Sequence, residues 1–391
     1  MTAPRNFVAD HVQAIPRSGI RDFFEIVQSM SDVISLGIGE PDFVTPWHIR
    51  EAAIFSLERG RTGYTSNLGL PRLRRSISRY VQKHYHVHYE PMTEVLVTVG
   101  VSEAMDMCLR AVLNPGDEVI FHEPCYVSYS PSIALAHGKA VSITTKVEHQ
   151  FKLRAEDIRA VLTPRSKVLI LNFPTNPTGG VMTREDLEPI AALVKEHDLL
   201  VITDEIYSEL NYTGHHVSIA SLPGMRERTI FLHGFSKAFA MTGFRIGYAC
   251  APVALTEAMM RIHQYAIMCA TTMSQEAAYE AIERGEHEMV EMREQYRMRR
   301  NFLVASFKDM GLPCFEPQGA FYLFVPIAST GLNCREFAVR LLEEEKVAVV
   351  PGNAFGPSGE GFVRCSYATA FDQLEIAVER IARFVKKLKT V

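Results

Sequence analysis

Short apolar runs alternate with amphipathic segments from about residue 95 to about residue 275 of this 391-residue chain. The amphipathic segments are predicted helices; Thr183, followed by Glu185 and Asp186, indicates one helix start, where acidic groups suit the helix dipole. Strands that alternate with helices predict a mostly parallel sheet covered on both faces, and runs that are apolar throughout are typical of doubly buried strands. We therefore expect an α/β fold with a mostly parallel, seven-stranded sheet, its strands in EVLVTVG, EVIFHEP, AVSITT, KVLILNFP, LLVITDEIY, TIFLHGFS and RIGYACAP.

The pattern changes after about residue 275, which indicates a second, smaller domain. One long helical stretch, SQEAAYEAIERGEHEMVEMREQYRMRRNFLVASFKDM, leads into shorter runs such as GAFYLFVP and FVRCSYA, and the chain ends in a helical segment. A chain of this length exceeds what one simple core usually holds. We predict an N-terminal arm with a small-domain segment at 1–45, a large domain at 46–285 and a small α/β domain at 286–391, joined by a long helix.

Composition excludes several classes of partner. A net charge of −4 gives no reason to expect nucleic acid, and no apolar run approaches the roughly 18 residues of a membrane span. The seven cysteines include no C-x-x-C pair, which favours reduced thiols and a cytoplasmic location. We also expect no metal at the histidines of KHYHVHYE (His84, His86 and His88), because this segment reads as the exposed end of a helix that runs into a loop.

Polar residues follow the predicted strands, at the edge where parallel sheets bind ligands. Lys237 comes directly after TIFLHGFS. Such a lysine often only extends its amine from a strand end to solvent. Here Ser236 precedes it and Arg245 follows between Gly243 and Gly247, a combination that suits a phosphate group. A neutral lysine beside a phosphate site indicates a Schiff-base lysine.

Asp204 ends the run LLVITD and is the second candidate. It could simply cap a following helix. Alternatively, its carboxylate could favour the protonated form of a heterocyclic nitrogen, and a protonated pyridine ring withdraws electrons from an amino-acid α-carbon. Tyr207 and Asn176 could then hydrogen-bond a ring hydroxyl, although NFPTNPTGG alone is typical of a Pro/Gly turn.

The chain resembles the class I/II aminotransferases of the aspartate aminotransferase superfamily (fold type I). The resemblance extends from SGIRDF and GIGEPDF to GNAFGPSGEGFVRCSYA, and it rests above all on GFSKAFAMTGFRIG after NPTGG and DEIY. Within that superfamily, the chain is similar to the subgroup of bacterial aspartate, aromatic and N-acetyl-diaminopimelate aminotransferases. This resemblance implies a pyridoxal 5'-phosphate cofactor and an amino acid and a 2-oxo acid as substrates, with the amino group moved in a ping-pong reaction.

The resemblance also implies a role for each site residue. Lys237 would carry the cofactor and move the substrate proton, Asp204 would pair with the pyridine nitrogen, and Asn176 and Tyr207 would bond the phenolic oxygen. The remaining implied positions are Tyr126 on the ring face, Val101, Ser102, Ser236 and Arg245 on the phosphate, Tyr64 on the phosphate of a partner subunit, and Arg364, Asn176 and Gly39 at the substrate carboxylate. The role of Tyr64 implies a homodimer with shared active sites.

Substrate choice is less constrained. Some relatives carry a lysine for acidic side chains in the turn after VTVG, where this chain has Ser102. We therefore expect a broad range of donors, aromatic or neutral, or aspartate by another route, with 2-oxoglutarate as acceptor. Two alternatives remain open on the same scaffold, a C–S β-lyase and an aminocyclopropane-carboxylate-synthase-like enzyme. A cofactor-sensing domain fused to a DNA-binding module is not expected, because GIGEPDF begins by residue 37.

Overall fold

The computed structural model describes residues 6–15 and 30–389. Its α-helices are α1 (Asp10–Gln13), α3 (Trp47–Glu58), α4 (Pro71–Tyr85), α5 (Gly100–Val112), α6 (Tyr129–Leu135), α7 (Ala155–Val161), α8 (Arg184–Glu196), α9 (Val253–Ala266), α10 (Thr272–Arg284), α11 (Glu286–Asp309), α12 (Cys334–Glu345) and α13 (Phe371–Lys389). Its strands are β1 (Ile34–Ser35), β2 (Val95–Thr98), β3 (Glu118–Glu123), β4 (Lys139–Thr144), β5 (Ser166–Asn172), β6 (Leu200–Asp204), β7 (Thr229–Gly234), β8 (Gly247–Cys250), β9 (Tyr322–Pro326), β10 (Val347–Ala348), β11 (Val350–Pro351) and β12 (Phe362–Ser366). The SGIRDF segment at 18–23 lies outside the described residues.

The predicted seven-stranded sheet is confirmed. Its strand order is β2-β8-β7-β6-β5-β3-β4, and only β8 runs antiparallel to its neighbours. The expectation of doubly buried strands is wrong for β4, where most residues are exposed. β4 is an edge strand that pairs with β3 alone, so less of its surface is covered than in the central strands.

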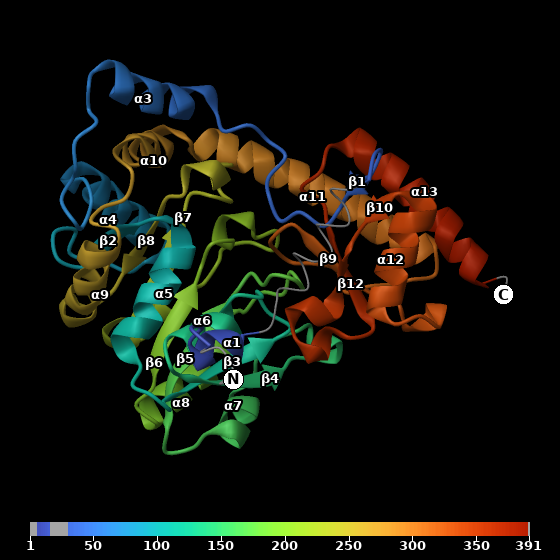
Figure 1. Cartoon of the computed structure of the whole chain (residues 1–391), viewed down its shortest axis with the longest axis horizontal. Coiled ribbons are helices and arrows are strands. Elements are labelled where there is room, and N and C mark those ends of the chain that lie inside the picture. Colours follow the sequence, from blue (N-terminus) through green and yellow to red (C-terminus); the bar gives the residue numbers. More distant parts are fainter. Residues whose placement is uncertain (1–5, 16–29, 390–391) are drawn as a thin grey trace, which may run out of the picture.

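Helices cover both faces of this sheet (Figure 1). One face packs its apolar side chains against α5, α6 and α9. The other face packs against α3, α4 and α10 at one end and α7 and α8 at the other. The Thr183 side chain and Asp186 form the capping box that starts α8, as the acidic first turn predicted. The parallel strands therefore end together at one open edge.

The smaller unit surrounds a three-stranded antiparallel sheet of order β11-β12-β9, with α11, α12 and α13 around its core. β1 joins it from the start of the chain by pairing in parallel with β10. The predicted division at 285/286 falls where α10 ends and α11 begins, and the domain limits themselves stay a prediction.

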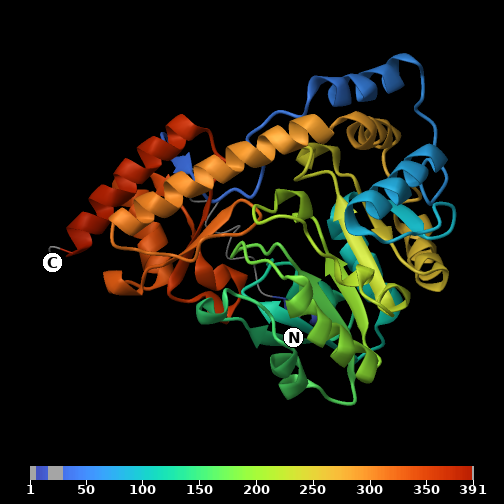
Figure 2. The ribbon, with the colours of Figure 1, turned by 180° about the vertical axis from the view of Figure 1, so that it is seen from behind.

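The single long helix predicted after residue 275 is wrong. Two helices, α10 and α11, meet at Gly285, and α11 runs from the large unit along the small one (Figure 2). A Cβ at Gly285 would lie 2.7 Å from the carbonyl oxygen of Ala281 and about as close to the Phe239 ring. A glycine fits at this position because a side chain would collide with these two groups.

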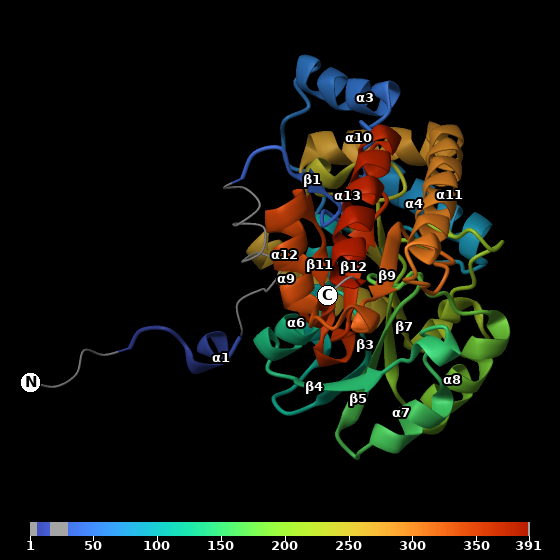
Figure 3. The same ribbon diagram turned by 90° about the vertical axis from the view of Figure 1, so that its right-hand side faces the viewer.

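The first described segment lies at the side of the molecule. Helix α1 packs near α6 through His11 and His137, whose ring centroids are 4.8 Å apart (Figure 3). None of the helices in the described part of the chain combines the length and apolar character that a membrane crossing requires.

Candidate active site

A cavity of about 750 Å³ opens at the carboxyl ends of the parallel strands, between the large sheet and the small unit. β6 brings Asp204 to it, the turn after β7 brings Ser236 and Lys237, and β12 brings Arg364. Of the predicted site residues, all except Tyr64 line this cavity. Residues spread from Gly39 to Arg364 in the sequence are therefore gathered in one place.

The amine of Lys237 points into the cavity and donates a 2.6 Å hydrogen bond to the carbonyl oxygen of Gly39. Burial lowers the pKa of Lys237 to about 8, and the charges of Arg364 and Arg245 act in the same direction, against Glu40. A lysine with this pKa is partly neutral near pH 7 and is therefore able to act as a nucleophile.

The carboxyl group of Asp204 is buried at the end of β6. Its Oδ2 accepts a 2.7 Å hydrogen bond from the Tyr129 hydroxyl, and its Oδ1 accepts one from the Ile206 amide at 3.2 Å. Burial raises the pKa of Asp204 to about 6, which these two hydrogen bonds oppose. Among the described residues no basic side chain forms an ion pair with it. The site thus presents a buried anion that lacks a cationic partner.

Arg364 is buried between two aromatic rings. Its guanidinium carbon lies 4.3 Å from the ring centroid of Tyr322 and 4.7 Å from that of Phe355. One terminal nitrogen donates to Oδ1 of Asn176 at 2.8 Å and the other to the carbonyl of Gly37 at 2.6 Å. The Nε atom has no partner within the described residues. A planar fork held in this way suits a carboxylate.

An anion-binding corner lies where α5 begins. Val101 and Ser102 form the first turn of α5, and the guanidinium of Arg245 lies so near that a Cβ at Gly100 would be 2.6 Å from its Nη2. Gly100 has a φ of +74°, which also favours glycine. The free amides at a helix N-terminus and an adjacent arginine together make a site for a phosphate.

Tyr207 closes the side of the cavity that faces the small unit. Its hydroxyl and that of Tyr322 share a 2.8 Å hydrogen bond. A Cβ at Gly39 would overlap the Tyr322 hydroxyl, so the backbone of Gly39 approaches the cavity because it has no side chain. Tyr126, 37% exposed, packs edge-on against Tyr129 at 5.7 Å between centroids.

Sequence reasoning missed Tyr129, which bonds Asp204, and Tyr322, on which Arg364 stacks. Their segments, YSPSIAL and YLFVP, read as ordinary helix and strand. A signal was present for Tyr129, since it lies three residues after Tyr126 and so on the same side of a helical turn. No comparable signal marked Tyr322.

Tyr64 lies outside the cavity and is 83% exposed.

The three histidines of KHYHVHYE lie at a helix end that runs into a loop, as predicted. His84 is in the last turn of α4, and His86 and His88 are beyond its end. Within the described ranges, no group of three or more His, Cys, Asp or Glu residues could hold a metal ion.

Comparison with known proteins identifies the family. The model of the family "Aminotransferase class I and II" matches residues 31–381. YugH of Bacillus subtilis is 51% identical over 98% of this chain and 99% of its own length, and an aspartate aminotransferase of Pyrococcus abyssi is 46% identical over 98% and 99%. The solved structure of an aromatic aminotransferase from Pyrococcus horikoshii superimposes with a TM-score of 0.90 at 46% identity, covering 95% of this chain and 100% of that one. Enzymes of this family use pyridoxal phosphate and act on amino acids and 2-oxo acids. The chain belongs to the class I and II aminotransferases.

Proposed function

We propose that this aminotransferase binds pyridoxal phosphate through Lys237 and exchanges amino groups between neutral or aromatic L-amino acids and a 2-oxo acid. One observation carries the assignment of the site: a single cavity holds a lysine with a lowered pKa, a buried carboxylate without a cation and a buried arginine with a free Nε. These three groups match the aldehyde and ring nitrogen of the cofactor and the carboxylate of the substrate.

The residues of the cavity fit the cofactor. Arg245, Ser236 and the first turn of α5, with Val101 and Ser102, would hold the phosphate. Asp204 would pair with the ring nitrogen, whose positive charge would replace the missing partner of this buried anion. Tyr126 would cover one ring face. Tyr207 and Asn176 would bond the phenolic oxygen.

When bound, pyridoxal phosphate withdraws electrons from the α-carbon of the amino acid. The Nζ atom of Lys237 is the base that we propose for the proton on that carbon, because it is the amine that lies in the cavity with a pKa near the working range. Tyr129 keeps Asp204 in place through its hydroxyl.

Arg364 would fix the substrate. Its Nε and a terminal nitrogen would bind the two oxygens of the α-carboxylate, with Asn176 on one side and the backbone near Gly39 on the other. Because Tyr322 and Phe355 hold the guanidinium plane, the carboxylate would be oriented as well as bound. Orientation of the Cα–H bond across the ring accounts for much of the rate in such reactions.

The charges around the cavity favour neutral side chains. Among its described lining residues, the cations are Lys237, Arg245 and Arg364, and each is assigned above. Glu40 adds a carboxylate to the same wall. An acidic side chain would therefore meet no further cation from this part of the chain, whereas an aromatic one would meet Ile38 and Tyr126. We propose 2-oxoglutarate as the acceptor to test first, although its distal carboxylate would need a cation from outside these lining residues.

We further propose that the enzyme is a homodimer. Tyr64 is 83% exposed and Tyr265 88%, and Ile267 and Met268 are also unusually open for apolar residues. Asn67 ties these two segments together by donating to the carbonyl of Met268 at 2.8 Å. A second copy that covered this surface would bring Tyr64 to the neighbouring phosphate corner, as the resemblance implies.

We also propose a cytoplasmic location. All seven cysteines lie in the described residues, and each is a free thiol. Unpaired thiols are typical of a reducing compartment.

An absorbance scan of the purified protein with pyridoxal phosphate tests the assignment. We expect a band near roughly 360–430 nm from a lysine-bound cofactor, replaced by one near about 330 nm when a donor amino acid is added. Lys237→Ala should bind the cofactor without this exchange. A wild-type protein without any band would contradict the proposal. Pyruvate and ammonia released from cystathionine without an acceptor would show the lyase instead.

A further inference from the structure

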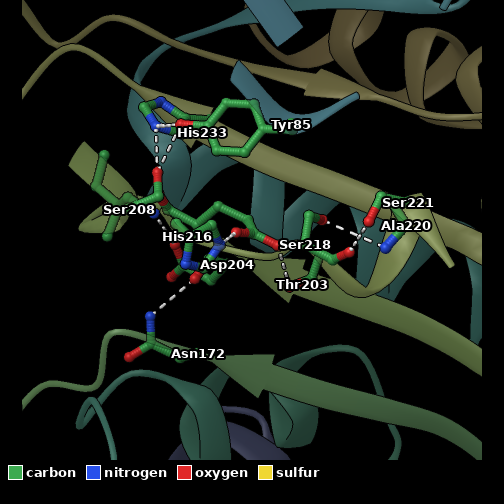
Figure 4. A network of polar contacts seen from close by, with 12 residues as sticks. Tyr85, Asn172, Thr203, Asp204, Ser208, His216, Ser218, Ala220, Ser221 and His233 are labelled. Carbon is green, nitrogen blue, oxygen red and sulfur yellow. Dashed lines mark hydrogen bonds and ion pairs between the residues drawn. The ribbon is translucent and has the colours of Figure 1, made fainter. Parts of the chain in front are cut away.

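A buried polar cluster lies behind the active site, on the other face of the large sheet. Asp204 and Leu232 are neighbours in the β6–β7 register, and successive side chains of a strand alternate between faces, so His233 points away from the cavity. There it contacts Tyr85 of α4, and Ser208 and Glu209, which belong to a short 3-10 helix at Ser208–Leu210. Tyr80 of α4 joins the cluster through Glu209. Figure 4 shows Tyr85, Ser208 and His233 grouped on one side of the strands.

The carboxylate of Glu209 is the centre of this cluster. Its Oε1 accepts hydrogen bonds from the hydroxyls of Tyr80 at 2.7 Å and Tyr85 at 2.5 Å. Its Oε2 lies 2.8 Å from Nε2 of His233. Burial opposes the ionisation of Glu209, but His233 and the tyrosine hydroxyls outweigh it and lower the pKa of Glu209 to about 2. Glu209 is therefore a carboxylate that is 9% exposed and has hydrogen-bond partners at both oxygens.

The backbone fixes the orientation of the His233 ring. The amide of Gly234 donates to Nδ1 of His233 at 2.6 Å, so the proton on Nε2 is the one directed at Glu209. The ring stacks between Phe231 and Tyr248, with centroids 6.1 Å and 5.5 Å away. The His233 side chain is 1% exposed and has little room to rotate.

Stability alone is a weak reason for such a pair. A buried carboxylate with its hydrogen-bond partners often contributes no more to folding than well-packed apolar residues of similar volume would, because the charge loses its hydration. The surroundings of the cluster, from Phe231 to Val81 and Ile77, are apolar enough to accept such residues. What an apolar pair would lack is a fixed distance and direction between two points of the backbone.

The pair joins the two segments that carry the reacting groups. Glu209 lies two residues after Tyr207 and five after Asp204, and Ser208 donates back to the carbonyl of Glu205 at 2.7 Å. His233 lies four residues before Lys237. On the cavity side, Tyr129 holds Asp204 through its carboxylate. The end of β6 is thus held from both faces of the sheet.

We infer that Glu209 and His233 are positioning residues, whose hydrogen bond sets Asp204 and Tyr207 in register with Lys237. The inference rests on the proposed roles of those three residues. The pair does not touch the cavity and acts through the backbone of the two segments. A displacement near 1 Å at such a site can cost about 100-fold in rate.

Four variants of the cofactor-loaded enzyme test the inference. His233→Leu removes the donor, and His233→Gln retains an amide N–H that reaches toward Glu209. The double variant Glu209→Met, His233→Leu replaces the pair by apolar side chains. The matched control is His122→Leu, which removes an equally buried imidazole four residues before Tyr126; that ring stacks on Phe173 at 4.7 Å and is outside the cluster.

For His233→Leu we expect kcat to fall by about 10- to 100-fold. We also expect weaker binding of pyridoxal phosphate to the apoenzyme, and a lower ratio of visible circular dichroism to absorbance at the cofactor band, because the ring is held less rigidly. His233→Gln should recover most of all three values. The double variant should regain the thermal midpoint that His233→Leu loses, but neither kcat nor the dichroism. His122→Leu should stay close to wild type in kcat and in the dichroism ratio.

If the double variant regained kcat and the dichroism ratio as well as the thermal midpoint, the cluster would have only a structural role. Wild-type values in His233→Leu, or an equal loss in His122→Leu, would also overturn the inference. A wild-type enzyme without a cofactor band would instead refute the proposed function, and this inference with it.

Discussion

The hydroxyl of Tyr129 donates a 2.7 Å hydrogen bond to the carboxylate of Asp204, and this is the side-chain donor that the described residues supply to that buried anion. Burial raises the pKa of Asp204 to about 6, and the hydrogen bond from Tyr129, together with the one from the Ile206 amide, limits the rise. The protonation state of Asp204 therefore depends in part on Tyr129, to which the proposed site gives no contact with the cofactor.

Tyr129→Phe should move the acid limit of cofactor binding to higher pH. In the proposed site Asp204 pairs with the protonated ring nitrogen as an anion, so affinity should be lost as pH falls through its pKa. Loss of a hydrogen bond to a charged group, about 1.5 kcal/mol, raises that pKa by about one unit. Titration of the apoenzyme with pyridoxal phosphate between pH 5 and 8 measures the shift. An unchanged limit would show that Tyr129 does not support the anion.

Attachment of the cofactor to Lys237 should speed up as pH rises, with its midpoint near pH 8, and level off above about pH 9. The neutral amine is the nucleophile, and its fraction grows until the pH passes the pKa of about 8. Stopped-flow absorbance after mixing apoenzyme with pyridoxal phosphate gives the rate constants. A rate that keeps rising to pH 10 would mean that burial does not lower the pKa of this lysine.

Arg364→Lys should lower kcat/KM for amino acids by about 10- to 100-fold. Lysine keeps the positive charge but loses the planar fork and the stacking on Tyr322. Steady-state kinetics with the best donor should show the loss in both KM and kcat, because binding and orientation fail together. Arg335→Lys, at an exposed position of α12, is the control and should match wild type. Equal values for the two variants would remove Arg364 from the substrate site.

Tyr64→Phe should weaken binding of pyridoxal phosphate by about 10-fold, the usual value of one hydrogen bond to a charged group. Its thermal midpoint as apoenzyme should not change, since the hydroxyl is exposed in the single chain. Light scattering should give a dimer for both proteins. A monomeric wild type, or an unchanged affinity in the variant, would exclude a shared phosphate site.

The sequence predicted the strands of the large sheet because each is a short apolar run bounded by turns. It also led to Lys237 and Asp204, since each ends or follows such a run, whereas Arg364, which lies within FVRCSYA, came from the family resemblance. Tyr322 was missed because its role depends on the β9–β12 register, which sets it opposite Ser366, two residues from Arg364. Such pairings between distant strands follow from the tertiary fold and leave no local periodicity.

The error at Gly285 has a different origin. The residues on both sides favour a helix, so the periodicity continues across the break, and one glycine was not enough to end the prediction. A Cβ at this position would meet the carbonyl oxygen of Ala281, four residues earlier, and the ring of Phe239, 46 residues earlier in the chain. Glycine is itself a poor helix former, so a local preference and a long-range contact act together at this break.

The two rings that enclose Arg364 also affect the entropy of binding. A free arginine side chain loses about 2 kcal/mol of rotamer entropy when it is fixed in one geometry. Between Tyr322 and Phe355, with two nitrogens already bonded, that loss occurs as the chain folds. An arriving carboxylate therefore meets a guanidinium that is already immobile, and more of the attraction between them remains as affinity.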